Sequence, residues 1–68
     1  MSSNNLKNIK KLRNKKGWSQ EKLAREADIS YQTLIKIEQE RIKNPKIETI
    51  IKLAKALSVS IDKLVGKN

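Results

Sequence analysis

Polar side chains that could read base edges stand close together in one stretch of the chain. The stretch contains Tyr31, Gln32, Thr33 and Lys36, and it has no acidic residue before Glu38. A glutamine amide can form two hydrogen bonds with adenine, and a lysine ammonium can reach the acceptors of guanine in the major groove. The missing negative charge suits an approach to phosphate groups. The stretch is therefore a candidate surface for contact with a nucleic acid.

Catalytic residue types are largely missing. The 68 residues include neither histidine nor cysteine. The commonest general base and the commonest metal ligand are therefore absent, and neither a thiolate metal site nor a disulfide can form. No glycine-rich loop that could cradle a phosphate is present. We expect a protein without enzymatic activity, with no cofactor, no metal and no small-molecule ligand.

The overall charge favours a polyanionic partner. The chain has 16 Lys and Arg residues against 7 Asp and Glu residues, which gives a net charge of +9. Such a charge repels itself in a compact fold, so either a nucleic acid or an anionic membrane surface is expected to use it. The simpler alternative is that the lysines only keep a small protein soluble. Residues 1–5 are polar and no apolar run could span a membrane, which fits the cytoplasm.

Helical periodicity runs along the chain and predicts a single all-α domain over residues 1–68. Helices are expected at about residues 5–15, 20–27, 31–39 and 45–57, and in a short stretch from Ser60 to Gly66. The residues expected to face inward are Leu6, Ile9, Leu12, Leu23, Ala24, Ala27, Leu34, Ile37, Ile47, Ile50, Ile51, Ala54, Leu57 and Leu64. Trp18 is expected to join this core and not to stack on a nucleobase.

The helix boundaries are predicted from capping residues. Serine is a favoured N-cap because its hydroxyl accepts a backbone N–H of the first turn, and it precedes three of the segments as Ser19, Ser30 and Ser60. Gly17 is placed to end the first helix in the left-handed conformation. Asn44 is expected to cap the fourth helix, with Pro45 as its first residue.

Residues 20–38 have the layout of two short helices joined by a three-residue turn. Such a pair meets at a steep angle and presents its second helix as a ridge, and the major groove admits one α-helix. The outward face of that helix would carry Tyr31, Gln32, Thr33, Ile35 and Lys36. Some alternatives stay open: Tyr31 could only pack locally, Thr33 could supplement the cap, Ile35 could be a core-edge residue, and Lys36 could touch phosphate alone.

Within residues 6–65, short motifs follow one another between Gly17 and Asp62. They are Gly17-Trp18-Ser19-Gln20, Leu23-Ala24, Ile29-Ser30, Leu34-Ile35-Lys36-Ile37-Glu38, Leu53-Ala54-Lys55-Ala56-Leu57 and Val59-Ser60-Ile61-Asp62. In this order they resemble the phage-repressor/Cro type of helix-turn-helix domain. The resemblance implies a compact, lambda-repressor-like fold of five helices. It also implies a transcriptional regulator that reads double-stranded DNA with a recognition helix at about residues 31–39.

The resemblance assigns roles to single residues. It implies base contacts for Tyr31, Gln32 and Lys36, and a phosphate contact for Gln20, which also braces the recognition helix. The remaining implied roles are phosphate contacts for Arg41, Lys43 and Asn44 and a structural ion pair between Arg13 and Glu38. The chain departs from the family at Asp28 and Glu40, where glycine is common; the aspartate tolerates a left-handed backbone better than most residues.

Functions of different classes remain open. The first is a regulator that binds a palindromic operator as a two-fold homodimer, with a dimer contact near Ser58 and Ile61. The second is an antitoxin-type interaction module that binds a toxin and regulates its own operator. Only three residues follow Val65, so no spare segment for a toxin is expected, which favours the first. A membrane-surface protein is disfavoured because the apolar stripes are needed for a mutual core.

Overall fold

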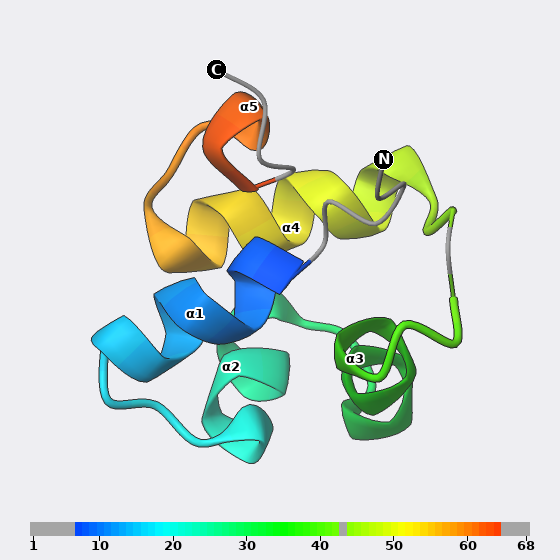
Figure 1. The fold of residues 1–68 in the computed structure, drawn as a ribbon, viewed down its shortest axis with the longest axis horizontal. Coiled ribbons are helices and arrows are strands. Elements are labelled where there is room, and N and C mark those ends of the chain that lie inside the picture. The colour runs from blue at the N-terminus through cyan, green and yellow to red at the C-terminus, as the bar shows by residue number, and fades with distance from the viewer. Residues whose placement is uncertain (1–6, 43, 65–68) are drawn as a thin grey trace.

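A computed structural model describes residues 7–42 and 44–64 of the chain (Figure 1). The helices are α1 (Lys7–Lys15), α2 (Gln20–Ala27), α3 (Tyr31–Glu38), α4 (Ile47–Leu57) and α5 (Ile61–Leu64). The described residues form no strand, so the predicted all-α class is confirmed. Leu6, Lys43 and Gly66 lie outside the described residues. None of the described helices has both the length and the apolar character that crossing a membrane requires.

All five helices contribute to one core. The fully buried side chains are Ile9, Leu23, Leu34, Ile37, Leu53 and Leu64. Helix α2 packs against α3 and α4, while α1 lies against α3, α4 and α5. Trp18, Ile29 and Val59 lie partly buried against the same core from the turns. The expected core position of Trp18 is thus confirmed.

The serine caps are confirmed. The hydroxyls of Ser19, Ser30 and Ser60 each accept the backbone N–H three residues later, at 3.0 to 3.1 Å. Each bond satisfies one of the N–H groups that the first turn of a helix leaves without a partner.

Helix α4 begins two residues later than the sequence predicted. Its N-cap is Lys46, which has an extended backbone and makes no side-chain cap hydrogen bond. The expected cap at Asn44 and the helical start at Pro45 are therefore wrong. The physical reason is tertiary: Pro45 is half-buried in a groove facing α3, beside Ile42, and this packing holds the segment extended until Ile47.

Two isoleucines of α4 expected in the core are exposed. Ile47 is 63% exposed and Ile51 is 39% exposed, while Leu53, absent from the expected core, is fully buried. The buried stripe consists of Ile50, Leu53, Ala54 and Leu57. Apolar residues are so dense in α4 that two overlapping stripes satisfy the helical period. The positions of α2 and α5 select one of them.

Four helices end with the same backbone motif. The residues at these ends are Gly17, Asp28, Glu40 and Ser58, all with positive φ between 58° and 74°. In each case the next residue donates its N–H to the carbonyl five positions back, at 2.8 to 3.2 Å. This is the hydrogen bond of a Schellman motif, which normally uses glycine. Asp28 and Glu40 therefore adopt the left-handed conformation for which glycine is favoured.

A buried polar network joins α1 to α3. Arg13 donates from Nε to Glu38 Oε2 at 2.8 Å and from Nη2 to Glu38 Oε1 at 3.0 Å. Its Nη1 donates to the carbonyl of Trp18 at 2.9 Å, and Gln20 Nε2 donates to Glu38 Oε1 at 2.9 Å. The two charged side chains are only 9% and 3% exposed. The structure thus contains the ion pair that the resemblance implied, and among the described residues no buried side-chain nitrogen or oxygen lacks a hydrogen-bond partner.

Glu38→Gln is expected to destabilise the fold by about 3–5 kcal/mol, because it leaves the Arg13 charge buried without a counter-charge. Urea unfolding followed by circular dichroism measures the change. The matched control is Glu26→Gln, which breaks the exposed Lys22–Glu26 pair at 3.5 Å and should cost less than about 1 kcal/mol. Equal effects of the two variants would contradict a structural role for the buried pair.

Glu40→Gly is expected to stabilise the fold by about 0.5–1 kcal/mol. A left-handed residue with a side chain costs about 1–2 kcal/mol, and the larger unfolded entropy of glycine offsets about 0.5–1 kcal/mol of that gain. Thermal unfolding measures the change. Gly17→Ala is the reverse control. Gly17 has a φ of +74° and open space around an added Cβ, so a loss of stability in this variant comes from the backbone conformation alone.

Candidate nucleic-acid interface

The outward face of α3 is polar and free of carboxylates. Gln32 and Lys36 are exposed, and Tyr31 at the start of the helix is 43% exposed. The opposite face consists of the fully buried Leu34 and Ile37. Because residues four apart lie one above the other on a helix, Gln32 and Lys36 form a single ridge that points away from the core.

Gln39 extends this ridge and was missed in the sequence. It is the exposed C-cap residue of α3, seven positions after Gln32 and three after Lys36. The spacing i, i+4, i+7 places all three side chains on one helix face. That spacing was the available signal, but the expected face ended at Lys36.

Thr33 and Ile35 lie beside the ridge. Both are half-buried. The Thr33 hydroxyl accepts a hydrogen bond from Ser30 Oγ at 2.7 Å, while Ser30 Oγ accepts the backbone N–H of Thr33 at 3.0 Å. Thr33 therefore supplements the cap of α3, one of the two roles that the sequence left open.

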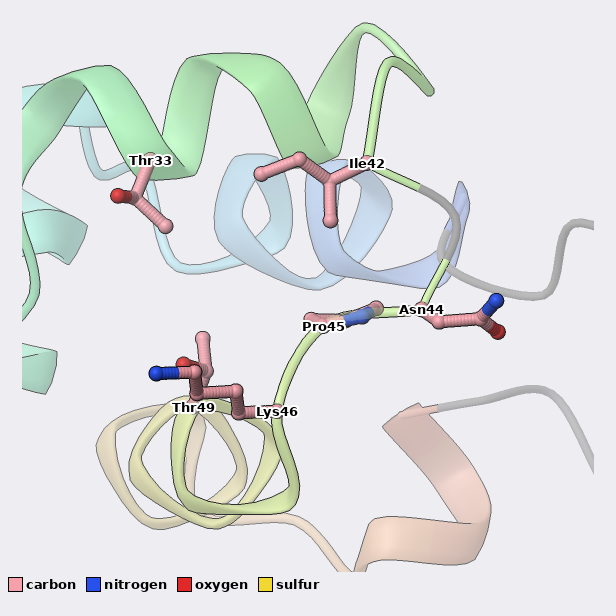
Figure 2. A pocket seen from close by; sticks show the side chains of 6 residues that line it. All are labelled: Thr33, Ile42, Asn44, Pro45, Lys46 and Thr49. Atoms are coloured by element: carbon pink, nitrogen blue, oxygen red, sulfur yellow. The ribbon is translucent and has the colours of Figure 1, made fainter.

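A groove of about 380 Å³ separates α3 from the start of α4. Thr33, Ile42, Asn44, Pro45, Lys46 and Thr49 line it. Figure 2 shows Thr33 and Ile42 on one side, Lys46 and Thr49 on the other, and the Asn44 amide pointing away from the rest. The opening of the groove carries threonine hydroxyls and the Lys46 ammonium group beside the N-terminus of α4, which has no side-chain cap. These groups favour the binding of an anion.

The expected phosphate-binding residues surround α3. Gln20, the first residue of α2, donates one N–H of its side-chain amide to Glu38 and so braces α3. Its other amide N–H and its amide carbonyl remain available for other partners. Arg41 is exposed beyond the end of α3 and donates to Gln39 Oε1 at 3.3 Å. Asn44 is exposed in the same connection. Lys43 lies outside the described residues.

Arg41 holds an unusual position in its helix end. In the other three Schellman motifs the residue after the left-handed one is Trp18, Ile29 or Val59, each packed against the core. At the end of α3 this residue is Arg41, and it is exposed. The motif therefore directs a guanidinium group to the surface beside the ridge, where the other motifs bury an apolar side chain.

Ser58 and Ile61 form a separate site. Both are exposed, Ile61 at 39%, and they lie at the end of α4 and the start of α5, away from α3 (Figure 1). The residues expected to contact a nucleic acid are thus brought together around α3, and the residues expected to contact a second copy are not part of that surface.

The comparisons with known proteins concern the family and the fold. A helix-turn-helix family model matches residues 9–64. No curated protein matches the chain.

Similar solved structures include SinR, described as a master regulator for biofilm formation, in complex with DNA. That match has 33% identity and a TM-score of 0.85 and covers 90% of this chain and 97% of that one. A chain of a SinR/SinI protein complex has 34% identity and a TM-score of 0.82 over 85% of this chain, which spans only 56% of that chain.

A hypothetical transcription factor from Neisseria, NHTF, has 32% identity and a TM-score of 0.83, with 94% of this chain and 76% of that one covered. The family match covers most of the chain, and the similar structures share its fold at more than 30% identity. The chain belongs to the Cro/C1-type helix-turn-helix family of DNA-binding transcriptional regulators, with a lambda-repressor-like fold.

Proposed function

We propose that the chain is a sequence-specific regulator that inserts α3 into the major groove of double-stranded DNA. The observation that carries the proposal is the ridge of Gln32, Lys36 and Gln39, which is exposed while Leu34 and Ile37 behind it are fully buried. A rigid, carboxylate-free ridge of donors and acceptors matches the pattern that base edges present. The similar protein SinR is found in complex with DNA, which supports the binding of DNA by this chain.

The residues divide into readers and anchors. Tyr31, Gln32 and Lys36 contact base edges, and Gln39 joins them at the far end of the ridge. Thr33 is assigned to the cap and to the edge of the groove, because its hydroxyl already bonds to Ser30. This revises the expected base contact of Thr33.

The anchors bind phosphates on both sides of the ridge. Gln20 reaches one strand from the start of α2, and Arg41, Lys43 and Asn44 reach the other from the connection to α4. The groove of Figure 2 opens beside Asn44 and adds Lys46 and the free N–H groups of α4. Phosphate contacts fix the register, while the readers determine the sequence.

Two copies bind one palindromic operator. The half-exposed Ile61 and the left-handed turn at Ser58 supply a small two-fold contact. Such a contact buries less than about 1,200 Å² in total, so the copies associate mainly on the DNA.

A protein partner is the second candidate. The observation that favours it is the apolar pair Ile47 and Ile51 on α4, 63% and 39% exposed. An interaction module, such as an antitoxin that also regulates its own operator, would cover this pair. The similar SinR is itself found in a complex with SinI.

Selection of bound DNA from a random duplex pool tests the proposed function. We expect one enriched sequence with two-fold symmetry. Binding to it should weaken steeply with salt, with a log–log slope of about −6 or steeper for the dimer, because each neutralised phosphate contributes about −0.9. No enrichment together with a slope near zero would reject DNA binding and leave the protein-interaction candidate.

Gln32→Ala is expected to relax specificity at one base pair in each half-site, with a loss of about 1–3 kcal/mol for the preferred base. Arg41→Ala, the matched anchor variant, should weaken all sequences by a similar factor and reduce the salt slope. Binding titrations against a panel of single-base operator variants measure both profiles. Identical profiles would refute the division into readers and anchors.

Ile61→Ser is expected to abolish cooperativity on the full palindrome and leave affinity for a single half-site unchanged. The reason is that the two-fold contact forms only when both half-sites are filled. Band-shift titrations on the two duplexes measure this, with Ile47→Ser as the control for an exposed isoleucine elsewhere. If the unmodified chain binds both half-sites independently, the dimer contact is wrong and the reading of DNA is unaffected.

A further inference from the structure

Two lysine ammonium groups lie over the single tryptophan of the chain. The Lys16 Nζ atom is 4.9 Å and the Lys22 Nζ atom is 5.7 Å from the centroid of the Trp18 ring. Lys16 follows α1 and Lys22 belongs to the first turn of α2, so two charges from either side of the connection converge on one ring. We call Lys16, Trp18 and Lys22 the Trp18 corner.

The charge of the Trp18 corner is poorly compensated. A cation over an aromatic ring is held by the ring but keeps its full charge and most of its hydrogen-bond donors. Lys22 also lies 3.5 Å from Glu26, but both side chains are 45% exposed, and such pairs exchange readily with other partners. Within residues 7–42 and 44–64, no ion pair involves Lys16. Both ammonium groups of the corner therefore keep positive charge that can bind an anion.

The Trp18 corner is rigidly connected to α3. The Trp18 carbonyl accepts a hydrogen bond from Arg13, whose guanidinium also binds Glu38 at the end of α3. Gln20, two residues after Trp18, donates to the same carboxylate. The backbone of the corner is therefore tied by hydrogen bonds to the helix that carries the ridge. A second contact on the same rigid body adds affinity with little further loss of freedom.

We propose that the Trp18 corner binds backbone phosphates of the operator beside the base pairs that α3 reads. The inference rests on the proposed function, because it assigns a further part of the same DNA surface. The two ammonium groups are positive point charges beside a fixed tryptophan ring. They can bind phosphate oxygens whatever the DNA sequence is. Trp18 holds the lysine stems in place and does not stack on a base. Lys16 and Lys22 thus add two anchors beyond Gln20.

Trp18 also supplies the readout, because it is the only tryptophan. In the free chain, iodide should quench its fluorescence more than neutral acrylamide does, since the two ammonium groups attract the anion. We call the difference between iodide and acrylamide quenching the iodide excess. Adding the enriched duplex, lengthened by about 5 bp (half a helical turn) on each side, should remove the iodide excess. The duplex phosphates then occupy the place of iodide.

Lys16→Gln/Lys22→Gln removes both charges and keeps side-chain stems over the ring. We expect this variant to lose the iodide excess and to flatten the salt slope by about 0.9 for each lysine and each bound copy. Lys16→Arg/Lys22→Arg should retain both properties. The control Lys10→Gln/Lys11→Gln makes the same charge change on exposed residues of α1 and should behave as the unmodified chain.

The outcomes separate the two claims. A steep slope that is the same in the unmodified chain and in Lys16→Gln/Lys22→Gln overturns the inference and leaves the proposed function standing. An iodide excess that persists when fluorescence anisotropy of a labelled duplex shows saturation overturns it as well. A slope near zero for the unmodified chain rejects the proposed function, and with it the inference.

Discussion

The buried pair of Arg13 and Glu38 determines where α3 can lie. The guanidinium forms two hydrogen bonds with the carboxylate and a third with the Trp18 carbonyl, and Gln20 completes the carboxylate. Each of these buried charges requires the other, because a single buried charge would have neither a counter-charge nor water around it. The pair also neutralises the carboxylate of Glu38, which is the only acidic residue of α3. One interaction therefore fixes the position of the helix and leaves its surface suited to an anionic partner.

The ends of the helices complete this constraint. Gly17, Asp28, Glu40 and Ser58 each reverse the chain in the left-handed conformation, and only the first is glycine. After three of these turns an apolar residue returns to the core and fastens the next segment. After α3 the turn instead exposes Arg41, and Ile42 and Asn44 line an open groove (Figure 2). The same Schellman motif thus stabilises the fold at three helix ends and exposes a cation at the fourth.

Burial and charge are divided between the two sides of α3. Leu34 and Ile37 hold the helix against α1 and α2, and the groove leaves it largely free of α4. The helix is therefore supported from behind while its outer face and its end remain open. The Trp18 corner and Arg41 lie on elements that flank the helix in sequence, so cationic groups come both before and after the ridge.

Local signals in the sequence were sufficient for the helices, their serine caps and the exposure of Tyr31, Gln32 and Lys36 on α3. Those features depend on hydrogen bonds and periodicity within a few residues, and they were predicted correctly at Ser19, Ser30 and Ser60. The start of α4 and the exposure of Ile47 and Ile51 were not. The sequence allowed two apolar stripes on α4 and wrongly predicted its start at Pro45. Only the tertiary structure determined the buried stripe and the first helical residue, because both depend on where α2, α3 and α5 pack.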